Sequence, residues 1–139
     1  MRRDLRIEEL DDLLELPLLA VLATYRRDGN ALLSPVWHEW HDGGFNVVTG
    51  GNGVKARHLR QDPRASIVVA DPEPPYRGIE IRTEAALLPV ESQIVQRIAA
   101  RYLGEAGSET YANGTTDDTL VRLEPGSLRT WDFADDFPT

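Results

Sequence analysis

The hydrophobic and polar positions in the first half of the chain follow the pattern of an antiparallel meander. Residues 18–25 form a near-continuous apolar run rich in strand-forming residues, and Asp28-Gly29 is a dipeptide typical of hairpin turns. We expect the chain to fold back there into a second strand over residues 31–40. A Gly-containing turn at residues 41–44 then leads to a third strand over residues 45–49. Three consecutive antiparallel strands argue against a parallel α/β fold.

Two short helices are expected beside these strands. Leu10, Leu13 and Leu14 recur at helical intervals among acidic residues, and Pro17 follows them. This spacing predicts a short amphipathic helix near the N-terminus. A second short helix is expected over residues 54–61, after a glycine-rich loop and before an Asp-Pro pair that ends it.

The second half of the chain returns to strands around one longer helix. Residues 78–87 alternate apolar and polar side chains, which predicts a strand with one buried face. Residues 91–103 carry a single apolar stripe, so we expect an amphipathic helix that ends at Gly104 and packs over one end of the sheet. Residues 104–118 are small, polar and aperiodic, and we expect little order there. Further strands are expected over residues 65–70, 120–123 and 128–133.

The count is about seven short strands and two or three helices, which favours a mainly β fold with minor α, either a barrel or a sandwich. The chain has 139 residues, and neither a repeat nor a linker divides it. We therefore expect a single domain over residues 1–139.

Composition narrows the classes of function. The chain has no cysteine, which excludes a thiol nucleophile, cysteine-bound zinc and an iron–sulfur cluster. Its formal net charge of -8 argues against nucleic-acid binding. The apolar run at residues 16–23 is too short to cross a membrane, and the N-terminus does not follow the pattern of a secretory signal. A cytoplasmic protein with neither a membrane nor a nucleic-acid partner is expected.

Residues 49–60 carry the strongest chemical signal. Their glycines lie between a strand and a helix, where backbone N–H groups and the helix N-terminus favour an anion. Lys55, the only lysine beside fourteen arginines, is found here with Arg57 and Arg60. The pattern predicts a phosphate site in outline, although a basic surface turn fits the same residues equally well. The antiparallel strands before the loop exclude a dinucleotide-binding βαβ unit.

Other candidate groups carry weaker signals. His38 and His41 fall on opposite faces of a strand, so no metal site is expected. Ser34 is not part of a Gly-x-Ser-x-Gly elbow, which argues against a hydrolase. Catalytic residues stay unassigned, and His38 is a candidate proton donor only if its side chain faces a substrate groove.

Several motifs spread over nearly the whole chain form one pattern. They are Leu22-Ala23-Thr24 with Asp28-Gly29, Ser34-Pro35-Val36-Trp37, Thr49-Gly50, residues 55–66 with the core Lys55-Ala56-Arg57, and Arg129-Thr130-Trp131-Asp132-Phe133. This combination resembles the pyridoxamine 5′-phosphate oxidase-like split-barrel family. It is most similar to the branch of that family that uses the deazaflavin coenzyme F-420.

The resemblance implies a six-to-seven-stranded antiparallel split β-barrel with peripheral helices. It also implies a homodimer that binds a cofactor in each of two grooves between the subunits. The cofactor phosphate would lie against Lys55, and Tyr76 and Arg77 would approach the ring or the phosphate from the partner subunit. The cofactor-binding residues expected on this basis are Ser34, Pro35, Val36, Trp37, Thr49, Gly50, Gly51, Lys55, Ala56, Arg57, Arg60, Tyr76 and Arg77.

The function implied by the resemblance is hydride transfer from reduced F-420 to a small conjugated or heterocyclic acceptor. There are two alternatives. One is an FMN-dependent oxidase or reductase of the same fold, and the other is a flavin- or deazaflavin-binding protein without turnover. Oxidation of pyridoxamine phosphate itself is not expected, because the substrate-binding C-terminal segment of that enzyme is not recognisable here. Gly53 stands where some family members carry a further basic residue, which leaves the phosphate more dependent on backbone N–H groups.

Overall fold

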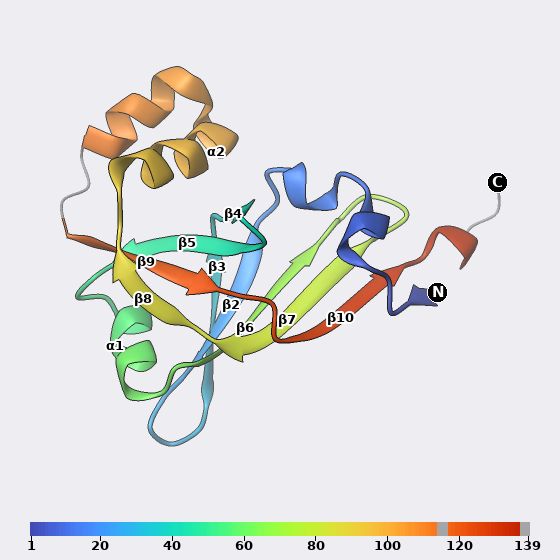
Figure 1. Ribbon diagram of the computed structural model, residues 1–139, viewed down its shortest axis with the longest axis horizontal. Helices are drawn as coiled ribbons and strands as arrows, with labels where there is room; N and C mark the ends of the chain where they lie inside the picture. The colour runs from blue at the N-terminus through green and yellow to red at the C-terminus, as the bar shows by residue number, and fades with distance from the viewer. Residues whose placement is uncertain (114–116, 137–139) are drawn as a thin grey trace.

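The structure, a computed structural model, describes residues 1–113 and 117–136. Within these ranges ten strands form two antiparallel sheets, with two helices beside them (Figure 1). The expected mainly β fold with minor α is confirmed. The strands are β1 (Arg2–Arg3), β2 (Ala20–Tyr25), β3 (Ala31–Val36), β4 (Glu39–His41), β5 (Gly44–Gly50), β6 (Arg64–Ala70), β7 (Gly78–Glu84), β8 (Ala86–Pro89), β9 (Asp118–Leu123) and β10 (Ser127–Asp132), and the helices are α1 (Val54–Gln61) and α2 (Ser92–Asn113).

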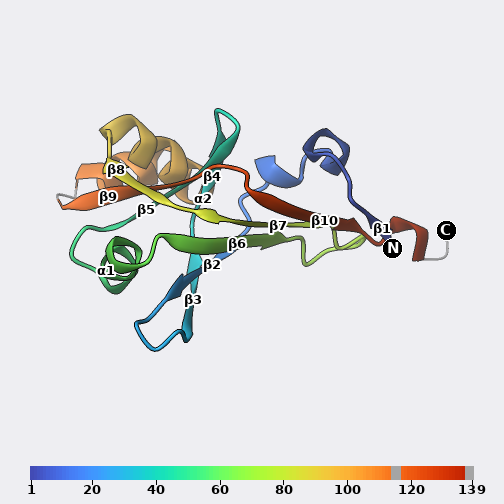
Figure 2. The same cartoon turned by 60° about the horizontal axis from the view of Figure 1, so that its bottom comes forward.

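The two sheets differ in length. The long sheet has the strand order β1-β10-β7-β6-β2-β3, and the short sheet has the order β4-β5-β9-β8. Figure 2 shows both helices at one end of the molecule, and β7 and β10 extending side by side toward β1 at the other end. The short sheet and both helices therefore share one end of the molecule.

The chain changes sheet at corners that break two of the expected strands. The pattern of residues 31–40 predicts one strand, but Trp37 and His38 form a corner between β3 in the long sheet and β4 in the short sheet. Residues 78–87 divide in the same way at Ala85, whose N–H donates to the Pro63 carbonyl at 2.8 Å. At the Ala85 corner the alternation of residues 79, 81, 83 and 85 continues to Leu87, so the sequence does not reveal the break there.

One hydrophobic core lies between the two sheets and the N-terminal segment. The leucines expected on the first helix are buried in it, but their segment forms two short 3-10 turns (Ile7–Leu10 and Leu13–Glu15) rather than one α-helix. Asp11 between the turns has a φ of 55°, a left-handed conformation that interrupts a helix. The largest fully buried apolar side chains are those of Leu10, Leu13, Leu22, Phe45, Val47, Ile67, Val69, Ile79, Ile81, Val121 and Leu123.

Helix α2 runs past its expected end. Gly104 has a φ of 76° and interrupts the helical backbone, which then resumes as far as Asn113. The glycine therefore makes a kink rather than a stop, and the segment expected to have little order begins as helix. Residues 114–116 of that segment lie outside the described residues. In the described part of the chain, neither helix combines the length and the apolar composition needed to cross a membrane.

Candidate functional site

A pocket of about 400 Å³ lies where the ends of β3 and β5 meet the start of α1 and the first part of α2. Six of the residues that the sequence predicts as cofactor-binding line it, namely Pro35, Val36, Trp37, Thr49, Gly50 and Lys55. Val48, Val95, Ile98 and Ala99 complete the lining. Predicted residues from separate motifs thus meet at one site.

Local sequence explains how these residues reach the pocket. Pro35 lacks an N–H group, and it is tolerated in β3 because β3 is an edge strand of the long sheet. Thr49 and Gly50 end β5, opposite the first residues of β9. Helix α1 starts at Val54, directly after the glycine loop, so Lys55 lies in its first turn and lines the pocket.

The α1 end of the pocket is electropositive. Lys55 has no carboxylate partner in the described part of the chain, and the first turn of α1 contains no acidic residue. The N–H groups of a first helical turn have no partner within the helix and carry partial positive charge. This end of the pocket therefore suits an anionic group such as a phosphate.

The glycine loop contributes less to this site than its sequence predicts. The N–H of Gly51 donates to the Asp117 carbonyl at 2.7 Å, and the N–H of Gly53 donates to the Gly50 carbonyl at 3.0 Å. A Cβ atom at Gly51 would lie 2.8 Å from the Asp117 carbonyl oxygen, so glycine permits this close approach of two backbone segments. The N–H groups of these two glycines are therefore already used, whereas those of the first turn of α1 have no partner within the helix.

Besides Gly51, four other predicted residues belong to the same elements but do not line the pocket. Ser34 is half-buried in β3, and Ala56 is fully buried in α1. Arg57 and Arg60 are exposed on α1, and Arg60 donates a hydrogen bond to the carbonyl of Gly51. The two arginines add positive charge beside the pocket without entering its lining.

Tyr76 and Arg77 lie away from the pocket, in the loop between β6 and β7 at the other end of the long sheet (Figure 2). Arg77 donates to the carboxylates of Asp12 at 2.7 Å and Asp71 at 3.1 Å and to the Leu10 carbonyl at 3.0 Å. Within one subunit Arg77 therefore joins this loop to the N-terminal segment. Its approach to a cofactor stays a prediction about a partner subunit.

Sequence analysis identified the apolar stripe of α2 but not its place in the pocket. Val95, Ile98 and Ala99 from this stripe form one wall of the pocket. Tyr102 from the same stripe stacks on Trp37, with ring centroids 4.9 Å apart and ring planes 7° apart. The helical spacing of apolar residues shows that this face of the helix must pack against another surface, but it does not show which surface that is.

His38 lies behind the pocket and is not part of its lining. Its side chain is fully buried, its ring meets Phe45 edge-on at 5.5 Å, and its Nδ1 atom lies 3.1 Å from the Tyr102 hydroxyl. Burial lowers the pKa of His38 to about 4, so the imidazole is neutral at neutral pH. The structure does not place His38 as a proton donor to a molecule in the pocket.

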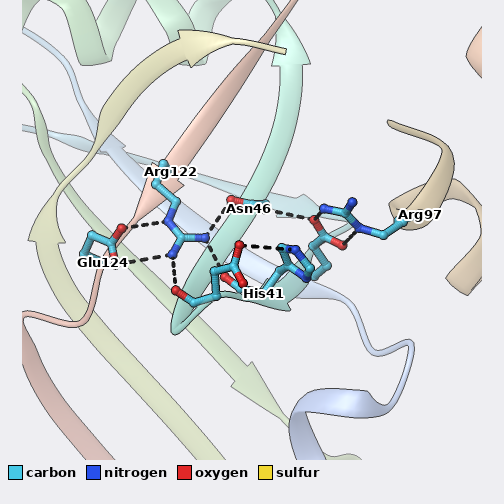
Figure 3. A network of polar contacts seen from close by, with 7 residues as sticks. His41, Asn46, Arg97, Arg122 and Glu124 are labelled. Carbon is cyan, nitrogen blue, oxygen red and sulfur yellow. Dashed lines mark hydrogen bonds and ion pairs between the residues drawn. The ribbon is translucent and has the colours of Figure 1, made fainter. Parts of the chain in front are cut away.

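The polar residues of β4 belong to a network between α2 and the short sheet (Figure 3). The carboxylate of Glu39 accepts hydrogen bonds from Arg97 at 3.0 and 2.9 Å and from Asn46 at 2.8 Å. Burial alone would raise the pKa of Glu39, but these hydrogen bonds hold it below its usual value. Arg122 extends the network by donating to Asn46 and to the His41 carbonyl. The described residues include no group of three or more His, Asp or Glu side chains placed to hold a metal ion.

Comparison with known families agrees with this architecture. The family model described as pyridoxamine 5′-phosphate oxidase matches residues 7–132, a range that includes both sheets except β1. The chain belongs to this family. The family resemblance carried by the sequence motifs is therefore confirmed. No curated protein matches the sequence.

The fold of this family recurs in solved structures. The conserved hypothetical protein Rv2991 from Mycobacterium tuberculosis is 24% identical over 97% of this chain and 90% of its own, with a TM-score of 0.81. An F420 reductase is 24% identical over 85% of this chain and 94% of its own, with a TM-score of 0.63. HutZ, the heme storage protein from Vibrio cholerae, is 18% identical over 91% of this chain and 94% of its own, with a TM-score of 0.71. Likenesses at this level of identity establish the fold.

Proposed function

We propose that the protein is a homodimeric oxidoreductase that binds coenzyme F-420, in preference to FMN, in the pocket between β3, β5, α1 and α2. It transfers hydride from the reduced cofactor to a small conjugated or heterocyclic acceptor. The observation that carries the proposal is the meeting of Trp37, Pro35 and Lys55 in one pocket. This arrangement joins a flat apolar wall to one cationic end, and a cofactor with a planar ring and a phosphate requires both.

The phosphate of such a cofactor fits the α1 end of the pocket. Lys55 and the first-turn N–H groups would hold it there, with Arg57 and Arg60 adding charge from outside. This local positive charge matters because the net charge of -8 makes the protein as a whole repel anions. Arg64, which follows α1, contributes little to this charge because it is paired with Asp62 at 2.7 Å.

The planar ring fits the apolar part of the pocket. The indole of Trp37 supplies an aromatic wall, and Val36, Val95 and Ile98 exclude water beside it. The volume of about 400 Å³ falls within the roughly 300 to 1,000 Å³ usual for small-molecule sites. When bound and reduced, a deazaflavin or flavin supplies the hydride. The residues of the chain orient the ring and keep the site dry.

The titratable groups of the pocket agree with this chemistry. Among the described residues that line the pocket, Lys55 is the only one with a titratable side chain, and it lies at the cationic end. The work left to the chain is therefore to orient the cofactor and to stabilise developing negative charge, without a dedicated proton donor in the hydride step.

The outer face of the long sheet supports the homodimer. Strand register places Val21 between Pro35 and Val68, and places Ala23 beside Leu33, on the side of the sheet away from the core. Leu33 is 65% exposed. A contiguous apolar face of this kind is typical of an interaction surface. Pro35 lies on this face and also lines the pocket, so a second subunit seated there would border the cofactor site.

Separate titrations of the cofactor-free protein with F-420 and FMN test the proposal, with tryptophan fluorescence as the readout. We expect tight F-420 binding that quenches Trp37, and loss of that quenching in a Trp37→Phe variant, which keeps Trp40 and Trp131 outside the pocket lining. A preference for FMN would instead favour a flavin enzyme of the same fold. Binding of neither cofactor would mean that the Lys55 loop is only a basic surface turn.

A second measurement separates an enzyme from a binding protein. Reduced cofactor bound to the protein is mixed with a panel of quinones, enones and tetrapyrroles, and reoxidation is followed by absorbance. If at least one acceptor reoxidises the bound cofactor faster than it reoxidises free cofactor, the protein is an oxidoreductase. Reoxidation no faster than that of free cofactor with every acceptor would favour a binding protein without turnover.

A further inference from the structure

Tyr102 of α2 connects two walls of the pocket although it does not line the pocket. Its ring stacks on the indole of Trp37, and its hydroxyl donates to the Leu18 carbonyl at 2.8 Å. The same hydroxyl accepts the backbone N–H of His38 at 3.2 Å and lies 3.1 Å from the Nδ1 atom of His38. One side chain thus joins α2, the segment before β2 and the corner between β3 and β4.

The hydrogen-bonding capacity of this hydroxyl is fully used. A phenol has one hydrogen to donate and two lone pairs to accept hydrogen bonds. We assign the hydrogen to the Leu18 carbonyl, the shortest contact of the hydroxyl, and this assignment makes both groups of His38 donors, with the neutral ring carrying its hydrogen on Nδ1. The Nε2 atom of His38 is buried without a hydrogen-bond partner in the described part of the chain. The His38 ring is therefore held by this hydroxyl on its polar side and by the Phe45 ring contact.

We propose that Tyr102 is a positioning residue of the pocket. Its hydroxyl fixes the ring on which Trp37 stacks, and so sets the orientation of the flat wall that meets a ligand. The geometry of Trp37 and Tyr102 is independent of the proposed function, and only the identity of the ligand rests on it.

The attachment of α2 itself does not depend on the Tyr102 hydroxyl. Arg97 binds Glu39, and Arg101 donates to the carbonyls of Glu15 at 3.3 Å and Leu16 at 2.8 Å. Loss of the hydroxyl alone should therefore leave α2 in place and the protein folded. This separates the positioning role from a general contribution to packing.

A ligand-free experiment tests the positioning of Trp37. Acrylamide quenching is measured in the wild type, in Tyr102→Phe and in the matching proteins that also carry Trp37→Phe, so that the Trp37 contribution is obtained by difference. We expect Tyr102→Phe, which keeps the stacked ring, to increase the quenching of Trp37. Tyr25→Phe serves as the control, because Tyr25 is half-buried in the β2 hairpin and does not line the pocket. Unchanged quenching of Trp37 in Tyr102→Phe would overturn the proposal.

A ligand-bound experiment tests the consequence for binding. Loss of one neutral hydrogen-bonding group should weaken F-420 or FMN binding by about fivefold to tenfold in Tyr102→Phe, and should weaken the induced circular dichroism of the bound ring. The salt dependence of Kd, which reports the phosphate contact, should stay unchanged. In the Trp37→Phe background the Tyr102→Phe change should cause no further loss, because Tyr102 acts through Trp37.

The outcomes separate the two proposals. If the wild type binds neither cofactor, the proposed function fails, and the quenching experiment still decides the role of Tyr102. If the wild type binds a cofactor but the losses from Tyr102→Phe and Trp37→Phe add independently, Tyr102 does not act through Trp37 and the positioning role is wrong.

Discussion

The carboxylate of Glu39 and the guanidinium of Arg97 form a two-point ion pair that ties α2 to β4. The Nε and Nη2 atoms of Arg97 donate at 3.0 and 2.9 Å to the two carboxylate oxygens. Glu39 is 5% exposed, and a buried carboxylate is costly without a partner. Since Val95 and Ile98 lie beside Arg97 in α2 and line the pocket, this ion pair holds a wall of the proposed cofactor site.

Replacing Arg97 with alanine should lower the free energy of unfolding by about 3 kcal/mol, because the buried carboxylate of Glu39 would lose its ion pair and keep the hydrogen bond from Asn46. Arg97→Lys keeps the charge but not the two-point geometry, so it should lower the free energy of unfolding by less. Urea unfolding at neutral pH measures both variants. Arg129→Ala is the matched control, since Arg129 pairs with Glu80 at the surface and should cost less than about 1 kcal/mol. Equal losses for Arg97→Ala and Arg129→Ala would contradict a structural role for the buried pair.

Replacing Lys55 with alanine should weaken F-420 binding tenfold or more. The basis is the ~1.5 to 3 kcal/mol typical of a hydrogen bond to a charged group. The slope of log Kd against log salt concentration should also decrease, because one cationic contact is lost. Arg64→Ala is the control, because Arg64 is exposed and already paired with Asp62, and it should change Kd less than about twofold. Unchanged affinity in Lys55→Ala would refute the assigned phosphate site.

Folding stability should decrease as the pH falls from 6.5 to 4, because His38 has a pKa of about 4 in the folded protein and a usual value of 6.5. Between these values the unfolded chain binds a proton that the folded protein does not, so acid favours unfolding. The resulting decrease in the free energy of unfolding is absent above pH 6.5 and reaches roughly 3 kcal/mol below pH 4. Urea unfolding at pH 7, 6 and 5 measures it. In His38→Gln the stability should change little over this range, and an unchanged slope would assign the pH dependence to other groups.

Part of the site follows from the sequence because its signals are local. A glycine loop before a short helix specifies where α1 begins, and the expected residues 54–61 match its observed bounds. The position of Lys55 in the first turn follows directly. Hairpin turns with Asp and Gly likewise predict β2 next to β3.

The rest depends on contacts between distant segments, which periodicity does not encode. Residues 31–40 contain no glycine that would mark the corner at Trp37 and His38, although β3 and β4 belong to different sheets. Arg77 also pairs with Asp12, which is far away in the sequence, and periodicity does not show this contact. The apolar stripe of α2 can be recognised in the sequence. The stacking of its Tyr102 on Trp37 can be recognised only in the structure.

Replacing Leu33 with glutamate should convert the proposed dimer to a monomer, because it puts a charge on the apolar outer face, next to Ala23. Sedimentation velocity over a range of protein concentrations measures the change. Leu128→Glu is the matched control. Leu128 is also exposed, but it pairs with Ile81 on the opposite face of the same sheet, so this variant should stay dimeric.

Cofactor binding gives the same experiment a second readout. If the partner subunit completes the pocket next to Pro35, the monomeric Leu33→Glu variant should bind F-420 more weakly than Leu128→Glu, although neither residue lines the pocket. A monomer with wild-type affinity would mean that each subunit holds a complete site. A Leu33→Glu protein that stays dimeric would place the interface on another surface, and a wild-type protein that is monomeric would refute the dimer itself.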